Sequence, residues 1–327
     1  MDFVITWVDD SDPEWKAQFN NYRKQTINDN RDVRFRSWDN FHFWFRGVEK
    51  FAPWVDKVHF VTWGHIPQWL NINHPKLNIV KHTDFIPKEY LPTFNTRTIE
   101  LNLHRIEGLC DEYVLFNDDV FLIDKVDEST FFVKGKPCDM PILKPFDISV
   151  YSKTILNDLI VINKHFDKRM AFKKQPCNWI NLSYGKFIIS NLFFNFFFRS
   201  HHLSFKNFHL ALPSKKETLM ILWELEFEVM HNSSKKKFRD YDTVNNYVQR
   251  YWDLASNNFH PTNITKIGSH FDLDDDNVKD VAKFIKSQKK PIVCVNDGDN
   301  LEKFEVTKNE IINAFGKLFS EKSNFEL

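Results

Sequence analysis

The chain has 327 residues, of which 42% are hydrophobic, so it is long enough to bury an ordinary core in one large domain or two small ones. Lys plus Arg and Asp plus Glu each number 44. This balance gives no overall field that attracts nucleic acid, and any anionic ligand must be held by local groups. We therefore expect a globular protein and exclude nucleic acid as its partner.

The cysteines indicate a reduced compartment. All four are far apart and form no Cys-x-x-Cys pair, so zinc and redox motifs are absent and a cytoplasmic protein is the simplest interpretation. No stretch of about 18 uncharged apolar residues exists to span a bilayer. Residues 187–198 come nearest, but Ser190, Asn191 and Asn195 interrupt this Phe-rich run. We expect a buried helix or a partner-binding face there, with a membrane-surface element as the alternative.

The first expected strand covers residues 3–8, a near-continuous apolar run typical of a parallel sheet. Asp9 and Asp10 follow at its exit. The sequence Ser-Asp-Pro-Glu at 11–14 then has capping-box spacing with proline in the first turn, which predicts a helix running toward residue 24. Its N–H groups would favour a phosphate, and Asp9 and Asp12 would suit a metal or a sugar hydroxyl. For Asp12 a helix-entry carboxylate is the alternative.

A repeated β-α-β rhythm follows. Apolar residues at helical spacing predict a helix over residues 41–51, and short strands are expected at 57–62 and 77–81. This order favours a mostly parallel, doubly wound α/β sheet with helices on both faces. Near the first long helix lie cations that would clamp a phosphate or form a solvated helix face: Arg31, Arg34, Arg36 and Arg46.

A helix is expected over residues 97–106. Glu100 and His104 are four residues apart and so share one face, and Arg97 lies one turn earlier. This face would present a cation, a carboxylate and an imidazole to one cleft. A surface Glu-His contact is the alternative interpretation.

The centre of the sequence is the segment 111–122. Tyr113, Val114, Leu115 and Phe116 predict a strand buried on both faces, and the polar residues Asn117, Asp118 and Asp119 follow where it leaves the sheet. Ligands of open α/β sheets bind beyond the strand carboxyl ends, and these oxygens suit a hard divalent cation. A solvated turn is the alternative.

Beyond residue 134 the character of the sequence changes. Residues 134–146 suggest loops or a β-hairpin, and helices are expected over 148–166, 214–230 and 240–256. We expect an α/β core formed by residues 1–145 and 257–327, and a mainly helical insert over the sheet formed by 146–256. The insert contains His209, which would be a catalyst or a core histidine, and Arg239.

The last segments complete the expected core. Residues 272–276 lack the Gly and Glu of a calcium loop and instead provide an acidic cap for a helix over 278–287. A strand at 291–295 is followed by Asn296 and Asp297, a third acidic strand exit. A final amphipathic helix at 308–319 would cover the sheet edge or dock a partner.

Five segments together resemble the Stealth family of sugar-1-phosphate transferases: TWVDDSDPEW (6–15), EKFAPW (49–54), LPTFN (91–95), IE-x-NLHRI-x-GL (99–109) and FNDDVF (116–121). The first two conserved blocks of that family correspond to residues 2–15 and about 31–122. A third rests on His209, Pro213 and Phe238-Arg239, and a fourth on residues 294–297.

The resemblance implies a Rossmann-like, glycosyltransferase-A-like fold and the transfer of a hexose-1-phosphate from a nucleotide sugar, expected to be UDP-linked, to a glycan hydroxyl. It implies a metal, Mg²⁺ or Mn²⁺, on Asp118, Asp119, Asn296 and Asp297. The expected catalytic residues are His209, Asp9, Arg97, Arg239, Glu100 and His104. Substrate binding is expected at Trp7, Asp12, Asn95 and Asn117. Peripheral association with the inner face of the cell membrane is also implied.

Two other functions fit the same features. A metal-dependent glycosyltransferase also needs a strand-end acid pair for its nucleotide sugar. A noncatalytic glycan-binding subunit is the alternative from another class, although a scaffold has no need of three acidic strand exits.

Overall fold

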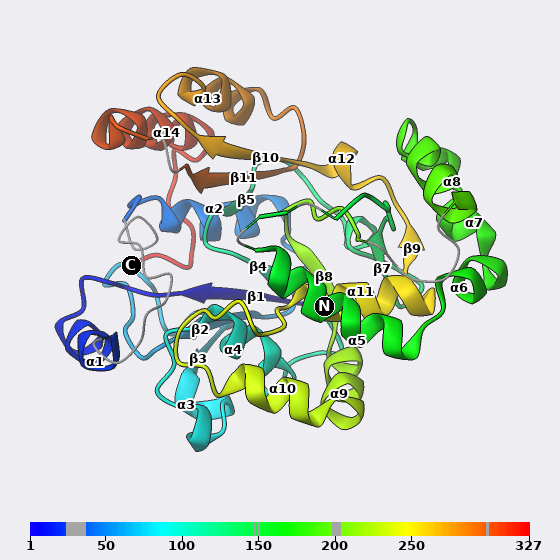
Figure 1. Ribbon diagram of the computed structural model, residues 1–327. Coiled ribbons are helices and arrows are strands. Elements are labelled where there is room, and N and C mark those ends of the chain that lie inside the picture. Colours follow the sequence, from blue (N-terminus) through cyan, green and yellow to red (C-terminus); the bar gives the residue numbers. More distant parts are fainter. Residues whose placement is uncertain (24–36, 147, 150, 198–203, 299–300) are drawn as a thin grey trace.

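A computed structural model describes residues 1–23, 37–146, 148–149, 151–197, 204–298 and 301–327 (Figure 1). Its main sheet has five strands in the order β3-β2-β1-β4-β8. The strands are β1 (Asp2–Trp7), β2 (Val58–Thr62), β3 (Leu77–Lys81), β4 (Glu112–Phe116) and β8 (Leu212–Lys215). The first four are parallel, in the 3-2-1-4 order of a Rossmann-like half. The expected α/β fold with a mostly parallel sheet is confirmed.

Strand β1 shows why helices cover both faces of this sheet. Successive side chains of a strand point to opposite faces. Phe3 and Ile5 enter a hydrophobic cluster with α2 (Phe41–Phe51), α13 (Val278–Ser287) and α14 (Phe304–Leu318). Val4 enters a second cluster on the other face, with α4 (Thr96–Leu101), α5 (Ser152–His165), α9 (Lys216–Leu225) and α11 (Tyr247–Ser256). The sheet is therefore doubly wound, as expected.

A second sheet with the order β10-β11-β5 lies beside the first. It contains β5 (Val120–Leu122), β10 (Gly268–Leu273) and β11 (Ile292–Asp297), and β11 pairs parallel with β10 but antiparallel with β5. Only residues 117–119 separate β4 from β5, so this turn joins the two sheets. A third small sheet is formed by β6 (Phe132–Val133), β7 (Lys136–Asp139) and β9 (His260–Pro261). Strands β6 and β7 form an antiparallel hairpin over residues 132–139, which overlaps the start of the segment 134–146 expected to form loops or a hairpin.

The remaining described helices are short. They are α1 (Pro13–Arg23), α3 (His82–Phe85), α6 (Lys168–Lys174), α7 (Pro176–Trp179), α8 (Phe187–Phe197), α10 (Phe227–Ser234) and α12 (Ile264–Ile267), with 3₁₀ turns at Lys88–Tyr90, Leu103–Arg105, Glu128–Thr130 and Leu182–Tyr184. Among the described residues, no helix combines the length and the apolarity that crossing a bilayer requires.

Four expectations need correction. The helix expected over 97–106 ends at Leu101, and a 3₁₀ turn follows. The helix expected over 214–230 is divided between β8, α9 and α10, and β8 pairs with β4 in the main sheet, so residues 146–256 are not only a layer over it. Only residues 247–256 of the segment 240–256 are helical. The Phe-rich helix α8 exists, but it is not buried, since Asn191 is its only buried residue.

The arginines expected near a phosphate divide into two groups. Arg31, Arg34 and Arg36 lie outside the described residues. Arg46 forms a bidentate ion pair with Glu326, with nitrogen–oxygen distances of 2.8 and 2.7 Å, and also donates to the Phe319 carbonyl. It therefore anchors the C-terminal segment to α2 and is not a phosphate clamp.

Candidate active site

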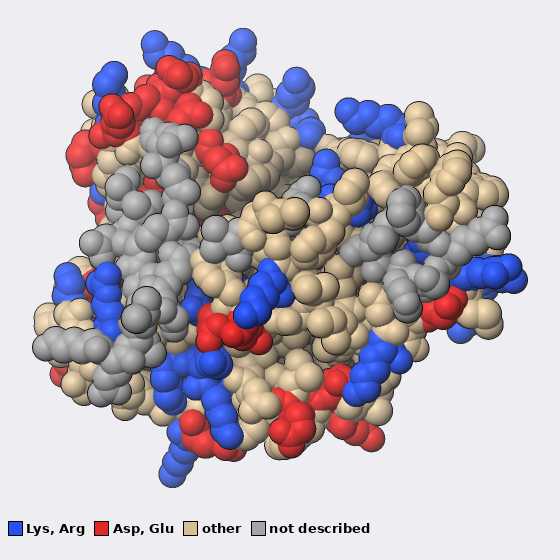
Figure 2. All heavy atoms as spheres, viewed as in Figure 1, with Lys and Arg blue, Asp and Glu red and all other residues tan. Residues whose placement is uncertain are grey.

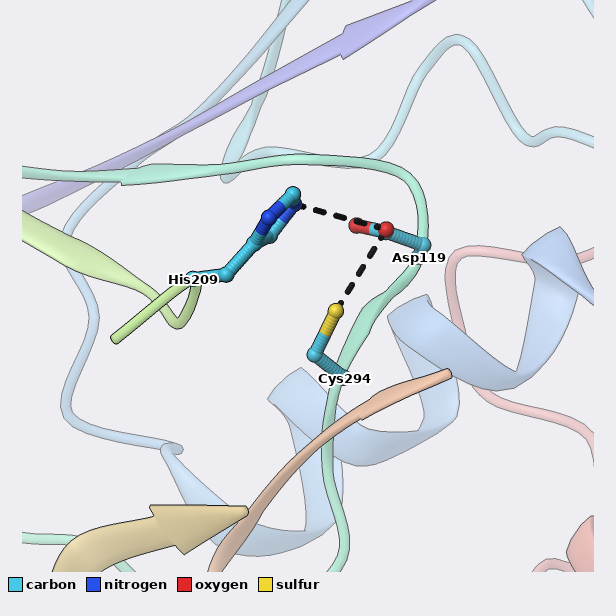
Figure 3. A group of neighbouring side chains, drawn as sticks. All are labelled: Asp119, His209 and Cys294. Atoms are coloured by element: carbon cyan, nitrogen blue, oxygen red, sulfur yellow. Dashed lines mark hydrogen bonds and ion pairs between the residues drawn. The ribbon is translucent and has the colours of Figure 1, made fainter. Parts of the chain in front are cut away.

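The turn between β4 and β5 carries the acidic pair. The Val295 N–H of β11 donates to the Asp119 carbonyl at 2.8 Å, which fixes the turn against the second sheet. Asp119 Oδ2 then accepts a hydrogen bond from Cys294 Sγ at 3.4 Å and lies 3.7 Å from His209 Nε2 (Figure 3). Asp119 Oδ1 is buried and has no hydrogen-bond donor among the described residues. Three distant parts of the chain therefore meet at one carboxylate.

His209 lies just before β8, and its backbone has a positive φ of 44°. Asn117 Nδ2 lies 3.4 Å from His209 Nε2, and a hydrogen bond from this amide requires the neutral tautomer in which Nε2 is the acceptor. The imidazole stacks on His270 of β10, with centroids 4.9 Å apart and planes 5° from parallel. The His209 side chain is 41% exposed, so part of the imidazole is open to solvent beside Asp119.

Asp118 is the exposed member of the pair, whereas Asp119 is only partly exposed. Desolvation by the surrounding protein and the charge of Asp119 together raise the pKa of the Asp118 carboxyl to about 7, and Arg239 opposes the shift. The charge of each carboxylate therefore disfavours the charge of the other. Because a bound cation would relieve this repulsion, the pair is suited to one.

Arg239 connects the acidic turn to α4. It lowers the pKa of both Asp118 and Glu100, so it lies within electrostatic reach of each carboxyl. Burial nevertheless raises the pKa of Glu100 to about 7, against the combined effect of Arg239 and Arg97. Arg239 is more than a hundred residues from Asp118 and Glu100 in the sequence, and the fold brings it within electrostatic reach of both carboxyl groups.

Arg97 and Asn95 shape the N-terminus of α4. The Asn95 side-chain oxygen caps the helix by accepting from the Arg97 N–H at 3.2 Å, and its amide donates to the Lys236 carbonyl at 3.1 Å. Asn95 is fully buried, so these contacts replace the substrate contact expected of it. The Arg97 guanidinium donates to Thr243 Oγ1 at 2.9 Å and to the Asp240 carbonyl. Both residues therefore hold the Arg239 segment in place.

The break after α4 separates His104 from Glu100. Leu103–Arg105 form a 3₁₀ turn, and the His104 ring lies 5.9 Å from the ring of Trp223. Burial, with Arg105 and Lys216 nearby, lowers its pKa to about 3. The expected shared face of Glu100 and His104 is wrong, because it depended on an unbroken helix.

The N-terminal residues form a separate local network. Asp12 Oδ1 accepts from the Trp15 N–H at 2.8 Å, so Asp12 is the helix-entry carboxylate of α1, and the expected Ser11 capping box is replaced. Asp9 Oδ1 accepts from the Ser11 N–H and hydroxyl at 2.9 and 2.6 Å. The Trp7 ring stacks on Phe41 at 5.6 Å. These contacts involve none of the residues that contact Asp119.

On β11, side-chain alternation separates the expected metal ligands. Cys294 and Asn296 lie on one face of the strand, and Asp297 lies on the other. Asn296 Nδ2 donates to Asp272 Oδ1 at 2.6 Å, and His270 Nε2 lies 3.4 Å from the same oxygen. The side chain of this strand that donates to the Asp119 carboxylate is that of Cys294.

Sequence comparisons find related proteins. Residues 1–26 match Stealth protein CR1, conserved region 1, and residues 34–139 match Stealth protein CR2, conserved region 2. The chain is 39% identical over 331 residues to the capsular polysaccharide phosphotransferase WcwK of Streptococcus pneumoniae, covering 100% of this chain and 98% of the relative. It is 36% identical over 337 residues to the receptor polysaccharide phosphotransferase WefC of Streptococcus gordonii, covering 100% and 99%.

The chain belongs to the Stealth family. It is accordingly a phosphotransferase. Among solved structures, this Stealth protein has weak similarity to the galactosyltransferase LgtC, with a TM-score of 0.41 and 10% identity over 99% of this chain and 98% of that one. The bifunctional glycosyltransferase WbbM gives a TM-score of 0.43 and 11% identity over 98% and 52%.

The Asp119 cluster of this Stealth protein can be tested for its fit to a cation. One ligand atom each from Asp119, His209 and Cys294 lie within 4.8 Å of one another. The unsatisfied Asp119 Oδ1 and the neighbouring carboxyl of Asp118 add oxygen donors, which Mg²⁺ and Mn²⁺ prefer, whereas imidazole and thiol ligands favour softer ions. Burial and the charge of Asp119 raise the pKa of Cys294 well above its usual value, so without a cation the thiol remains a hydrogen-bond donor.

Two residues of the Stealth site were missed by sequence reasoning. Cys294 was identified only as part of the fourth block, and His270 not at all. Cys294 could have been found from its position: it is a polarisable side chain in the apolar run of a buried strand, and it lies two residues before Asn296. No local signal marks His270, because its place beside His209 depends on the pairing of β10 with β11.

Proposed function

We propose that this protein transfers a hexose-1-phosphate from a UDP-linked sugar to a glycan hydroxyl, forming a phosphodiester in a capsular or cell-surface polysaccharide. Its full-length relatives named capsular and receptor polysaccharide phosphotransferases support this substrate class. The observation that carries the proposal is the Asp119–His209 pair, in which a partly exposed imidazole faces a carboxylate, with a second acid next to it in the sequence and Arg239 within electrostatic reach.

The proposed reaction is a displacement at phosphorus. The acceptor oxygen forms a bond to the phosphorus that carries the hexose, and the bond between that phosphorus and the bridging oxygen of the pyrophosphate breaks, so that UMP leaves with the electron pair. His209 Nε2 accepts the hydroxyl proton, and Asp119 Oδ2, 3.7 Å away, stabilises the resulting imidazolium. The Asn117 amide favours the tautomer with an unprotonated Nε2, and the acceptor hydroxyl would replace this amide as the hydrogen-bond donor to Nε2.

Groups around the turn between β4 and β5 would compensate the negative charge of the pyrophosphate. A Mg²⁺ or Mn²⁺ ion held by Asp118 and Asp119, with Cys294 beside them, would neutralise pyrophosphate oxygens. Arg239 would contact the transferring phosphoryl group, since it already compensates two carboxyl groups. Arg97 and Glu100 position Arg239. We leave Asp9, Asp12, Trp7 and Asp297 as candidates for donor binding around this centre.

Product analysis tests the reaction. The purified chain is incubated with UDP-sugars, a candidate glycan acceptor and Mn²⁺ or Mg²⁺, and the products are read by mass spectrometry. We expect UMP together with an acceptor that has gained a hexose phosphate. UDP together with a plain glycosidic product would instead establish a glycosyltransferase. Acceptor binding without turnover of any donor would establish a noncatalytic subunit.

Two substitutions assign the roles. Asp119→Asn removes the charge that would hold the cation and pair with the imidazolium, so turnover should fall at least about a hundredfold.

His209→Gln should lower turnover by a factor of about 10² to 10⁴, because the variant lacks the general base. Mn²⁺ binding, measured by calorimetry, should be retained in this variant. Asp276→Asn, at an exposed carboxylate, is the matched control. Full activity in Asp119→Asn would contradict the assignment.

A further inference from the structure

Helix α8 lies at the outer end of the molecule, together with α6 and α7 (Figure 1). The helix is apolar on both sides. Phe187, Ile188 and Phe194 are partly buried against the hydrophobic clusters, and the one fully buried residue of the helix is polar, Asn191. Large apolar side chains also face outward, where a helix at the surface of a water-soluble protein normally carries polar residues.

Polar contacts fix this orientation from the inside. Asn191 Oδ1 accepts from the Leu143 N–H at 2.9 Å, and its amide donates to the Trp179 carbonyl at 2.7 Å. Lys168, itself only 1% exposed, donates from Nζ to the Phe194 carbonyl at 2.8 Å. Because rotating the helix would break these buried hydrogen bonds, the outward apolar side chains of α8 cannot turn toward the protein.

The outward side is a continuous set of apolar residues. On α8, the exposed fractions are 72% for Ile189, 49% for Phe193, 63% for Phe196 and 72% for Phe197. Met170 of α6, which packs against α8, is 67% exposed. We call these five residues the α8 face. Exposed apolar surface of this kind marks an interaction site.

The segment that contains the α8 face is rich in basic residues, although the chain as a whole has no net charge. Within residues 144–206 the acidic residues are Asp147, Asp158 and Asp167 only, and the basic residues are Lys144, Lys153, Lys164, Lys168, Arg169, Lys173, Lys174, Lys186, Arg199 and Lys206. Lys153 and Lys164 are paired with Asp242 and Glu226, and Lys168 is buried, so these three cations are not among those that can meet an anionic ligand. Figure 2 shows the surface over α6 to α8 as mainly uncharged with basic residues at its margin, whereas acidic residues gather over α13 and α14.

We propose that the α8 face binds the surface of an anionic lipid bilayer. The helix has 11 residues and so is about 16 Å long, too short to cross a membrane but suited to lying in the interface with its aromatic side chains among the acyl chains. Arg169, Lys173 and Lys174 on α6 and Lys186 before α8 would contact lipid phosphates. This combination of an apolar strip and basic flanks favours a bilayer over a protein partner, and it is independent of the proposed transfer reaction.

Vesicle flotation of the full chain tests the proposal. One set of vesicles contains phosphatidylcholine alone, and the other contains equal parts of phosphatidylcholine and phosphatidylglycerol. We expect the chain to float with the anionic vesicles and to be released by high salt. The triple variant Phe193→Gln/Phe196→Gln/Phe197→Gln should bind at least about tenfold more weakly, because burial of aromatic surface is lost. Lys173→Gln/Lys174→Gln should weaken binding about thirtyfold, at roughly 1 kcal/mol per lysine.

A matched control uses apolar residues of similar exposure elsewhere. Ile72→Gln/Met220→Gln/Leu225→Gln replaces side chains that are 53%, 53% and 49% exposed, and it should bind vesicles like the parent chain. The thermal midpoint and the turnover of a soluble acceptor should be unchanged in all variants, which separates lipid binding from folding and catalysis. Equal vesicle binding by the parent and the α8 variant would overturn the proposal. So would absence of binding to anionic vesicles, or self-association of the parent chain without lipid that the α8 variant abolishes.

Discussion

At the scale of single residues, Glu100 shows how burial and neighbouring charge compete. Its carboxyl is enclosed by protein, which disfavours the charged form, while Arg239 and Arg97 favour it. Burial prevails, and the pKa rises from 4.5 to about 7. The native state therefore holds a proton that the unfolded chain releases between these two pH values.

This difference predicts a pH-dependent stability. Because the folded pKa is the higher one, the free energy of unfolding should decrease as the pH rises from 4.5 to about 7, by up to about 3 kcal/mol from this group. Glu100→Gln should flatten that part of the profile, and the exposed Glu224→Gln should leave it unchanged. Urea unfolding at a series of pH values measures the effect. Parallel profiles for the parent and Glu100→Gln would contradict it.

The same residue scale explains the limits of the site prediction. Asp118, Asp119, His209 and Arg239 were identifiable from residue type and from the position of an acidic pair after a buried strand. Their contacts were not, because the Asp119–His209 and Asp118–Arg239 pairs join segments separated by about 90 and 120 positions. The roles assigned to these residues stay predictions until the variants are measured.

At the scale of elements, helix α2 shows how closely the two sheets are joined. Gly47 faces β5, and a Cβ atom at this position would lie 2.7 Å from the Leu122 carbonyl oxygen. The backbone of α2 therefore approaches β5 more closely than any residue with a side chain permits. This close approach holds β5, and with it the acidic turn, against the hydrophobic cluster that contains Phe41, Phe43 and Phe45 of α2.

Two alanine substitutions should have opposite effects. Gly47→Ala should lower the free energy of unfolding by about 1 to 3 kcal/mol, since either α2 or β5 must move. Gly316→Ala in α14 has nothing within 4 Å of the added Cβ, so it should raise stability by up to about 1 kcal/mol through helix propensity. Chemical denaturation compares the pair. An unchanged free energy of unfolding in Gly47→Ala would contradict this prediction and show that α2 can shift without loss of stability.

At the scale of the whole molecule, the chain end returns to the first core. Phe325 is 2% exposed and lies against His74 and Phe45, with ring centroids 3.7 and 5.3 Å away. The neighbouring Glu326 pairs with Arg46 of α2. The last residues therefore connect the loop before β3 with α2.

Truncating this contact should destabilise the protein globally. Phe325→Ala removes a buried aromatic side chain and should cost about 3 to 5 kcal/mol. Leu327→Ala, two residues later at a side chain that is 72% exposed, should change stability by less than about 0.5 kcal/mol. Thermal and urea unfolding measure both variants. Similar losses in the two would show that the effect belongs to the chain end and not to packing of Phe325.

The sequence by itself determined the elements whose side-chain pattern is local: the apolar runs of β1, β2 and β4, and the helical periodicity of α2 and α13. The tertiary structure alone decided the edge position of β8, the end of α4 at Leu101, the contact of Cys294 with Asp119 and the outward orientation of α8. The physical reason is the same in each case. Periodicity reports what a segment does with its own neighbours, whereas strand pairing, buried hydrogen bonds and charge compensation depend on partners that only folding brings close.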